Sequence, residues 1–272
     1  MFFKLKKAWE LLQFTSKTLQ SELAVLRHSC EIKEKTEYFV VRSFTNPHFR
    51  WGNFLIFKQA PQKNDLPKWE EYFCLEFPEF IHQHRAFTWI HGEELPADCK
   101  ITEYLIEKTV CLTTKDVQPV KQIHPDITIR KVQTEQEWLE LEQKQAERIK
   151  PEDRDPSFLS FNKQKFKDYK AIVDKDLGDW FIADLGGEWV GDLGLFHSEG
   201  MACYQNVTTY PGFEGLGIAH ALVYGSAQYA IAHYPVKELV IVAEENSRAQ
   251  KIYQNLGFQV VERRTNLYRS YH

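Results

Sequence analysis

The sequence predicts a mixed α+β fold, in which a central mixed sheet is flanked by helices and a smaller N-terminal α/β domain precedes it. Short apolar runs bounded by turn residues alternate with amphipathic segments along the chain. A polar stretch with two prolines, residues 113–130, separates two parts, and 272 residues are enough for two cores. In the second part, three closely spaced strand candidates lead into a strand–helix–strand unit, whose neighbouring strands run parallel. We therefore expect two domains, residues 1–125 and 126–272.

The composition is that of an ordinary globular protein, with 43% hydrophobic and 26% charged residues. The net charge of −4 argues against nucleic acid as a partner, because broad nucleic-acid binding requires a basic face. The five cysteines are odd in number, far apart and without metal-ligand spacing. This pattern favours free thiols in a reducing compartment, so we expect a cytoplasmic protein with no metal site.

The first domain begins with a predicted helix. Lys4, Lys6, Lys7 and Glu10 interrupt its apolar residues, so the segment 1–14 is neither a signal peptide nor a membrane-spanning helix. We expect it to pack on its own domain, and we count no membrane among the partners. A basic amphipathic helix lying on a membrane surface is the alternative.

The rest of the first domain shows no recognisable catalytic set. Its histidines lack the spacing and carboxylates of a metal site, and its aromatic residues favour core packing over ligand binding. We assign no role to this domain. Its predicted elements are strands at 37–44, 51–57, 85–90 and 108–114, and helices at 66–77 and near 97–106.

The second domain opens with a strand at 126–132 and a helix at 134–149, where Thr134 and Glu137 have the spacing of a capping box. The dipeptide Gly186-Gly187 between two apolar runs predicts a tight hairpin. The other predicted elements are a helix at about 160–175, strands at 180–185, 188–196 and 201–210, a helix to about residue 232, a strand at 238–243, a helix at 247–255 and a final pair of strands.

A glycine-rich turn, residues 212–217 with the sequence GFEGLG, connects the strand at 201–210 to the helix after it. The first N–H groups of a helix lack intrahelical acceptors, and the helix dipole adds partial positive charge there. Glycine lets the chain turn with positive φ and approach a phosphate closely. The segment is therefore suited to anion binding, although such a sequence alone is often only a turn.

A second pattern follows the apolar strand at 238–243. Asn246 or Ser247 is suited to cap a helix, and Asn246, Ala249 and Tyr253 share one face of that helix. Gly257 is placed to end it.

Together, the two segments resemble the GNAT family of acyl-CoA-dependent N-acyltransferases, which pairs a Q/R-x-x-G-x-G/A turn with a later N-x-x-A-x-x-x-Y-x-x-x-G-F segment. The later segment is matched at Asn246, Ala249, Tyr253, Gly257 and Phe258, and the resemblance covers about residues 126–272. It implies a GNAT-like sheet that splays open after its fourth strand, with the pantetheine arm of acetyl-CoA in the gap. The first domain lies outside the resemblance, and its alternating strands and helices leave open a degenerate copy of the same fold.

The resemblance also implies a function and a set of site residues. The chain would transfer an acetyl group from acetyl-CoA (coenzyme A) to the primary amine of an unidentified small molecule or peptide. Backbone groups of Val207 and Thr209 would pair with pantetheine, and Tyr253 would be the catalytic residue that donates a proton to the leaving thiolate. The residues implied in cofactor binding are Val207, Thr208, Thr209, Gly215, Leu216, Gly217, Ile218, Ala219, Asn246, Ala249 and Tyr253.

No residue stands out as the general base that would deprotonate the amine. Gln205 and Asn206 on the fourth strand cannot act as bases. A carboxylate elsewhere and a chain of water molecules both remain open as the proton acceptor. The carboxylates considered are Glu152, Asp153, Asp155, Glu244 and Glu245.

Two residues depart from the family pattern. Gly212 stands where the family usually has Gln or Arg, and Glu214 stands at a position that is often basic. In solvent the repulsion between the Glu214 carboxylate and the pyrophosphate of the cofactor is about 1 kcal/mol. We therefore expect weaker cofactor binding rather than none. The alternative function is therefore a non-catalytic acyl-CoA sensor or a protein-interaction module. A dinucleotide-binding oxidoreductase fits poorly, because the turn is not followed by an acidic ribose ligand at the expected distance.

Overall fold

The computed structural model describes residues 16–80, 84–91, 94–96, 99, 101, 103–119 and 124–270. The helix expected within residues 1–14 lies outside these residues. Contacts between residues divide the chain into two units, Met1–Cys111 with Val261–His272, and Leu112–Val260. The boundary predicted after residue 125 falls inside the second unit. None of the described helices is long and apolar enough to cross a bilayer.

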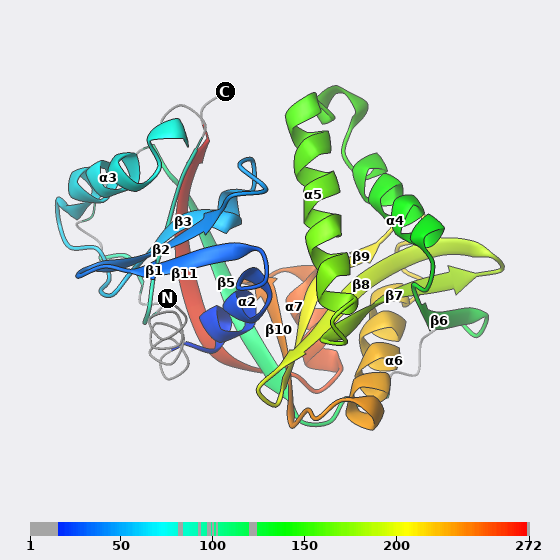
Figure 1. The fold of residues 1–272 in the computed structure, drawn as a ribbon. Coiled ribbons are helices and arrows are strands. Elements are labelled where there is room, and N and C mark those ends of the chain that lie inside the picture. The colour runs from blue at the N-terminus through cyan, green and yellow to red at the C-terminus, as the bar shows by residue number, and fades with distance from the viewer. Residues whose placement is uncertain are drawn as a thin grey trace. The chain divides into compact units, whose positions relative to one another are not determined.

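The first unit combines helices with a mixed sheet (Figure 1). Its elements are α2 (Lys17–Leu26), β1 (Cys30–Glu34), β2 (Tyr38–Ser43), β3 (Asn53–Phe57), α3 (Asp65–Glu76), β4 (His84–Trp89), most of β5 (Leu105–Thr114) and most of β11 (Gln259–Ser270). The sheet order is β1-β2-β3-β4-β11-β5. Strands β1 to β3 pair antiparallel, whereas β3 and β4 are parallel and are connected through α3.

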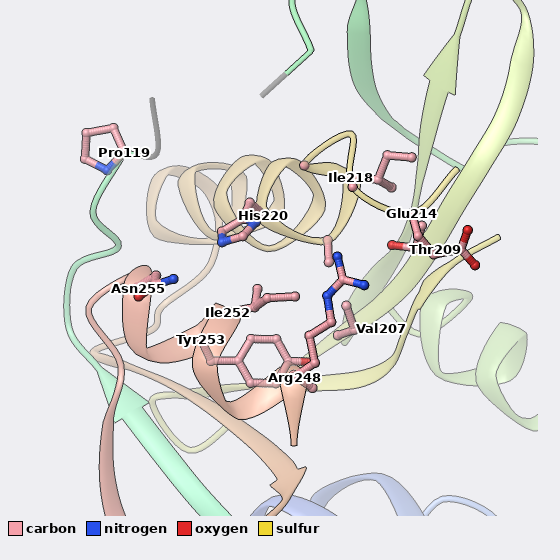
Figure 2. Close-up of a pocket in the computed structure, with 14 residues that line it drawn as sticks. Pro119, Val207, Thr209, Glu214, Ile218, His220, Arg248, Ile252, Tyr253 and Asn255 are labelled. Carbon is pink, nitrogen blue, oxygen red and sulfur yellow. The ribbon is translucent and has the colours of Figure 1, made fainter. Parts of the chain in front are cut away.

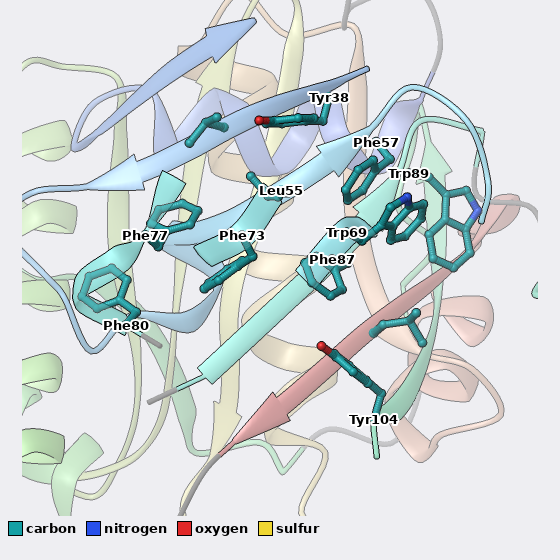
Figure 3. Packing of buried hydrophobic residues seen from close by; sticks show 12 residues of the cluster. Tyr38, Leu55, Phe57, Trp69, Phe73, Phe77, Phe80, Phe87, Trp89 and Tyr104 are labelled. Atoms are coloured by element: carbon teal, nitrogen blue, oxygen red, sulfur yellow. The ribbon is translucent and has the colours of Figure 1, made fainter. Parts of the chain in front are cut away.

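Aromatic side chains fill the core of the first unit beneath α3 (Figure 3). Phe57 at the end of β3 stacks on Trp69 of α3, with ring centroids 3.6 Å apart. The parallel pairing of β3 with β4 continues to Phe57 and Trp89, the last residues of the two strands. The expectation that the aromatic helix packs into the core is confirmed. Strands β3 and β4 stay paired up to their last residues.

Two predictions near the ends of the first unit are wrong. Residues near 97–106 were expected to form a helix, but Leu105 already begins β5. The expected final pair of strands is one continuous strand, β11. Its central residue Arg264 is 1% exposed and donates hydrogen bonds to Thr88 Oγ1 and to the carbonyl of Trp89. A third bond, to Ser16 Oγ, gives every nitrogen of the guanidinium a partner, so this charged residue can lie buried within a continuous strand.

The second unit carries the longer run of antiparallel strands (Figure 1). Its elements are β6 (Ile127–Lys131), α4 (Glu135–Glu147), α5 (Pro156–Val173), β7 (Gly178–Leu185), β8 (Glu188–Ser198), β9 (Met201–Thr209), α6 (Ile218–His233), β10 (Glu238–Glu244) and α7 (Arg248–Asn255). The sheet order is β10-β9-β8-β7-β6, and β9 and β10 form its parallel pair. The mixed α+β fold class is thus confirmed.

Local sequence signals explain several boundaries in this unit. Thr134 and Glu137 form the predicted capping box at the start of α4. Gly186 and Gly187 both have positive φ in the hairpin between β7 and β8, as the turn requires. Helix α5 begins earlier than expected, because the side chain of Asp155 accepts the amide of Phe158 and caps it.

Adjacent residues of β8 identify which helices cover each face of the β-sheet in the second unit. A β-carbon on Gly191 would lie 2.8 Å from Ile218 of α6. The next side chain, Asp192, bonds to Gln145 of α4. Because successive strand residues point to opposite faces, α6 covers one face of the sheet and α4 the other.

Candidate functional site

The parallel strands β9 and β10 pair along only part of their length. Their register begins at Met201 and Glu238 and ends at Cys203 and Val240. Strand β9 then continues to Thr209, and β10 to Glu244, without further paired residues between them in the stretch 124–270. The sheet therefore splays open where the resemblance implied, leaving strand backbone groups free to pair with a ligand.

A bulge shapes the free part of β9. Its register with β8 shifts between Thr208, opposite Asp192, and Gln205, opposite Gly194. Asn206 has φ +54°, a conformation that Asn tolerates better than most residues. The extra residue bends the strand locally and re-aims the side chains beyond it.

The glycine turn that follows has the backbone form that its sequence predicts. Gly212, Gly215 and Gly217 have φ values of +90°, +90° and +81°. A β-carbon on Gly212 or Gly215 would meet open space, so conformation rather than crowding calls for glycine there. Gly217 precedes α6, and its carbonyl accepts the amide of Ala221, so the amides before Ala221 have no acceptor within the helix.

A cavity of about 790 Å³ lies against this turn and the free part of β9 (Figure 2). It gathers residues from β9, the turn, α6 and α7, together with one residue that precedes β6. The lining residues are Pro119, Val207, Thr209, Glu214, Gly215, Gly217, Ile218, Ala219, His220, Arg248, Ala249, Ile252, Tyr253 and Asn255.

Three of the residues implied in cofactor binding do not line this cavity. Thr208 is 3% exposed and lies near Gln145 of α4, away from the cavity. The carbonyl of Leu216 accepts a hydrogen bond from the amide of His124. Asn246 is exposed, and its amide donates to the side chain of Gln250. The other eight line the cavity, and the binding role of all eleven stays a prediction.

Tyr253 reaches the cavity from α7. The helix begins after Ser247, whose hydroxyl accepts the amide of Gln250, so Ser247 rather than Asn246 is its N-cap. Figure 2 shows the Tyr253 hydroxyl directed toward Val207 and beside Arg248. Burial raises the pKa of Tyr253. The phenol therefore keeps its proton at neutral pH, as a proton donor must.

His220 and Arg248 also line the cavity. The sequence gave His220 no role, whereas it offered Arg248, together with Lys251, as a cation able to offset part of the repulsion by Glu214. Burial and the nearby charge of Arg248 lower the pKa of His220, so the imidazole is neutral at pH 7. Arg248 directly precedes Ala249 of the second motif, and that adjacency was the available signal. The cavity therefore holds one cation that the glycine turn itself lacks.

None of the five carboxylates considered as a general base lines the cavity. Asp155 instead caps α5, and Glu244 ends β10. The side chains of this cavity that can accept a proton are instead Glu214 and the neutral imidazole of His220.

Comparisons with known proteins bear on this geometry. The model of the acetyltransferase (GNAT) family matches residues 136–258. A functionally unknown conserved protein from Staphylococcus epidermidis is 14% identical, with a TM-score of 0.67 over 88% of this chain and 93% of that one. A GCN5-related N-acetyltransferase from Kribbella flavida is 12% identical, with a TM-score of 0.62 over 94% of both chains. A tandem GNAT protein from the clavulanic acid biosynthesis pathway is 10% identical, with a TM-score of 0.55 over 90% of this chain and 84% of that one. At these identities the structural likeness is one of fold.

Proposed function

We propose that this chain, whose second half belongs to the GNAT acetyltransferase family, transfers the acetyl group of acetyl-CoA to a primary amine by direct attack. The observation that carries the proposal is one cavity lined by free strand backbone at Val207 and Thr209, by the start of α6 and by Tyr253. Each of these parts has a use in thioester chemistry.

The hydrogen-bond donors that line the cavity are of the kind that would bind a phosphate-bearing thioester carrier. The amides from Gly215 to Ala219 would bind the pyrophosphate, because the start of a helix offers unpaired N–H groups and positive potential. The free edge of β9 would pair with the amide groups of pantetheine, as one strand pairs with another. Ala249 and Ile252 give the opposite wall an apolar surface.

The proposed reaction forms a C–N bond and breaks a C–S bond. The neutral amine attacks the thioester carbonyl carbon, and a backbone N–H of β9 stabilises the oxyanion that develops. Tyr253 donates its proton to the departing sulfur and regains one from solvent. The proton of the attacking amine leaves to solvent. Holding both reactants in one cavity supplies the approach geometry.

The test uses acetyl-CoA, coenzyme A and a panel of primary amines. We expect both nucleotides to raise the melting temperature, and at least one amine to release free thiol from acetyl-CoA. Stabilisation without thiol release would favour the sensor, and no stabilisation by either nucleotide would favour the interaction module. The cytoplasmic location expected from the number and spacing of the cysteines also belongs to this proposal.

We further propose that the first unit is a degenerate copy of the second. Helix α2 and strands β1, β2 and β3, then α3 and the parallel strand β4, repeat the order of α5, β7, β8, β9, α6 and β10. The first unit departs at the groove, because β3 and β4 stay paired to their ends and Phe57 and Trp69 pack over them. Asp65 also occupies the start of α3, where it accepts the amide of Gln62. These features leave no open strand edge between β3 and β4 with which pantetheine could pair.

A further inference from the structure

A buried carboxylate lies behind the wall of the cavity. Asp192 of β8 is fully buried and does not line the cavity. Its two oxygens accept hydrogen bonds from Trp180 Nε1 at 3.1 Å and from Gln145 Nε2 at 2.5 Å. Both donors are neutral, so the charge of Asp192 has no direct ion-pair partner in these two bonds.

Other charged and titratable groups face Asp192 from the neighbouring elements. Arg148 at the end of α4 donates to Gln145 Oε1 at 2.8 Å and stabilises the carboxylate at longer range. Lys165 of α5 faces the same region, and burial together with Arg148 lowers its pKa to about 8. Tyr210, just after β9, lies beside Asp192 and also favours its charged form. Burial outweighs these effects and raises the pKa of Asp192 to about 6.

The hydrogen bonds of this group lead to the bulge of β9. Thr208 is the cross-strand partner of Asp192, and its Oγ1 lies 3.4 Å from the same Gln145 Nε2. The hydroxyl of Thr208 donates to the carbonyl of Asn206 at 3.0 Å. A chain of polar contacts thus runs from Asp192 through Gln145 and Thr208 to Asn206. Val207 and Thr209, on either side of Thr208, line the cavity.

A charge buried among neutral donors costs stability, and apolar residues of similar volume commonly pack such a position better. Its presence directly behind a bulged strand edge points to a role in shaping that edge. Misplacing a backbone donor by about 1 Å is enough to impair a reaction that depends on it.

We propose that Asp192 is a positioning residue which, through Gln145 and Thr208, holds the bulge of β9 in the form that presents the backbone at Val207 and Thr209 to the cavity. The inference rests on the proposed function, because it takes this strand edge as the part of the site that grips the carrier. Asp192 touches neither reactant in this role.

Coenzyme A binding and amide hydrogen exchange of β9 test the inference. Thr208→Val removes the hydroxyl at nearly constant shape, Thr208→Ser keeps it, and Asp192→Asn removes the charge. Tyr234→Phe is the matched control, because it removes a hydroxyl bond to another carboxylate, Asp179, without touching β9 or the cavity. Calorimetry gives the affinity, and mass spectrometry gives the exchange of peptides covering residues 204–210.

We expect Thr208→Val and Asp192→Asn to speed exchange in 204–210 and to weaken coenzyme A about tenfold, the effect of losing one to two hydrogen bonds. Thr208→Ser should stay near the wild type in both measurements. Tyr234→Phe should lower the melting temperature only. Wild-type affinity and exchange in Thr208→Val would overturn the inference, even if Asp192→Asn does not fold. If the wild type binds no coenzyme A, the proposed function fails, whereas the exchange comparison still decides whether Thr208 and Asp192 hold the bulge.

Discussion

Glu214 turns its carboxylate back onto its own loop, where Oε2 accepts the amide of Gly212 at 2.9 Å. The acidic residue in an anion-binding turn is therefore part of how the turn holds its shape. Its charge still lies at the cavity wall. Shape and charge can be separated, because a glutamine at this position keeps the acceptor oxygen without the charge.

Glu214→Gln should tighten coenzyme A binding severalfold at low salt, because it removes a repulsion of about 1 kcal/mol from the pyrophosphate. Added salt should shrink this gain, since an exposed charge is screened. Titration calorimetry at low and high ionic strength measures both effects. A gain that is independent of salt would mean that the substitution acts through the shape of the turn.

Arg248→Ala should weaken coenzyme A about fivefold, because Arg248 is the cation that faces the cavity from α7. Lys251→Ala is the control, since Lys251 lies one turn along the same helix and does not line the cavity. The affinities of both variants, measured at one ionic strength, make the comparison. Equal losses in the two variants would assign the effect to overall charge rather than to Arg248.

Tyr253→Phe should lower the turnover number about a hundredfold, the usual contribution of a positioned acid, with little change in affinity for coenzyme A. The rate of thiol release from acetyl-CoA with a saturating amine measures the turnover number. Titration calorimetry measures the affinity for coenzyme A. Unchanged turnover would remove Tyr253 from the role of proton donor.

The pH dependence of the unfolding free energy should reflect the titration of Asp192. Burial raises its pKa from an ordinary value of 3.8 to about 6, so the folded protein binds this proton more tightly than the unfolded chain. The unfolding free energy therefore falls as the pH rises from about 4 through about 6, by about 3 kcal/mol for this group. Urea unfolding of the wild type and of Asp192→Asn across this range isolates the effect. A difference between the two proteins that grows in favour of the wild type with rising pH would contradict it.

Coenzyme A should bind with a stoichiometry of one per chain. The second unit opens between its parallel strands, whereas in the first unit Phe57 and Trp89 remain paired at the strand ends and Trp69 covers them. Titration calorimetry counts the sites directly. Two sites per chain would refute the view that the first unit is a filled copy.

The sequence predicted the parts of the site whose chemistry is local. The glycine turn and the start of α7 depend on residues within one turn or one helix, so the local sequence placed them. The role expected of Tyr253 came from the family resemblance. The capping box of α4 and the glycine hairpin followed for the same reason.

Residues that act through distant contacts could not be placed in this way. Asp192 meets Gln145 across 47 positions of the chain, and Gln145 meets Thr208 across 63. Nothing in the spacing of these residues shows that they share one side of the sheet. The same holds for Arg264, whose partner Thr88 is 176 residues away, so the sequence alone did not show that β11 continues past it.

Strand β11 starts in the second unit and ends in the first, where its Leu267 pairs with Phe87 of β4. The N-terminal unit therefore cannot complete its sheet until residues 261–270 have been synthesised. A gene cut at the apparent linker would yield an N-terminal fragment without one of its own strands. Such an N-terminal fragment cannot be moved to another protein as a self-sufficient part.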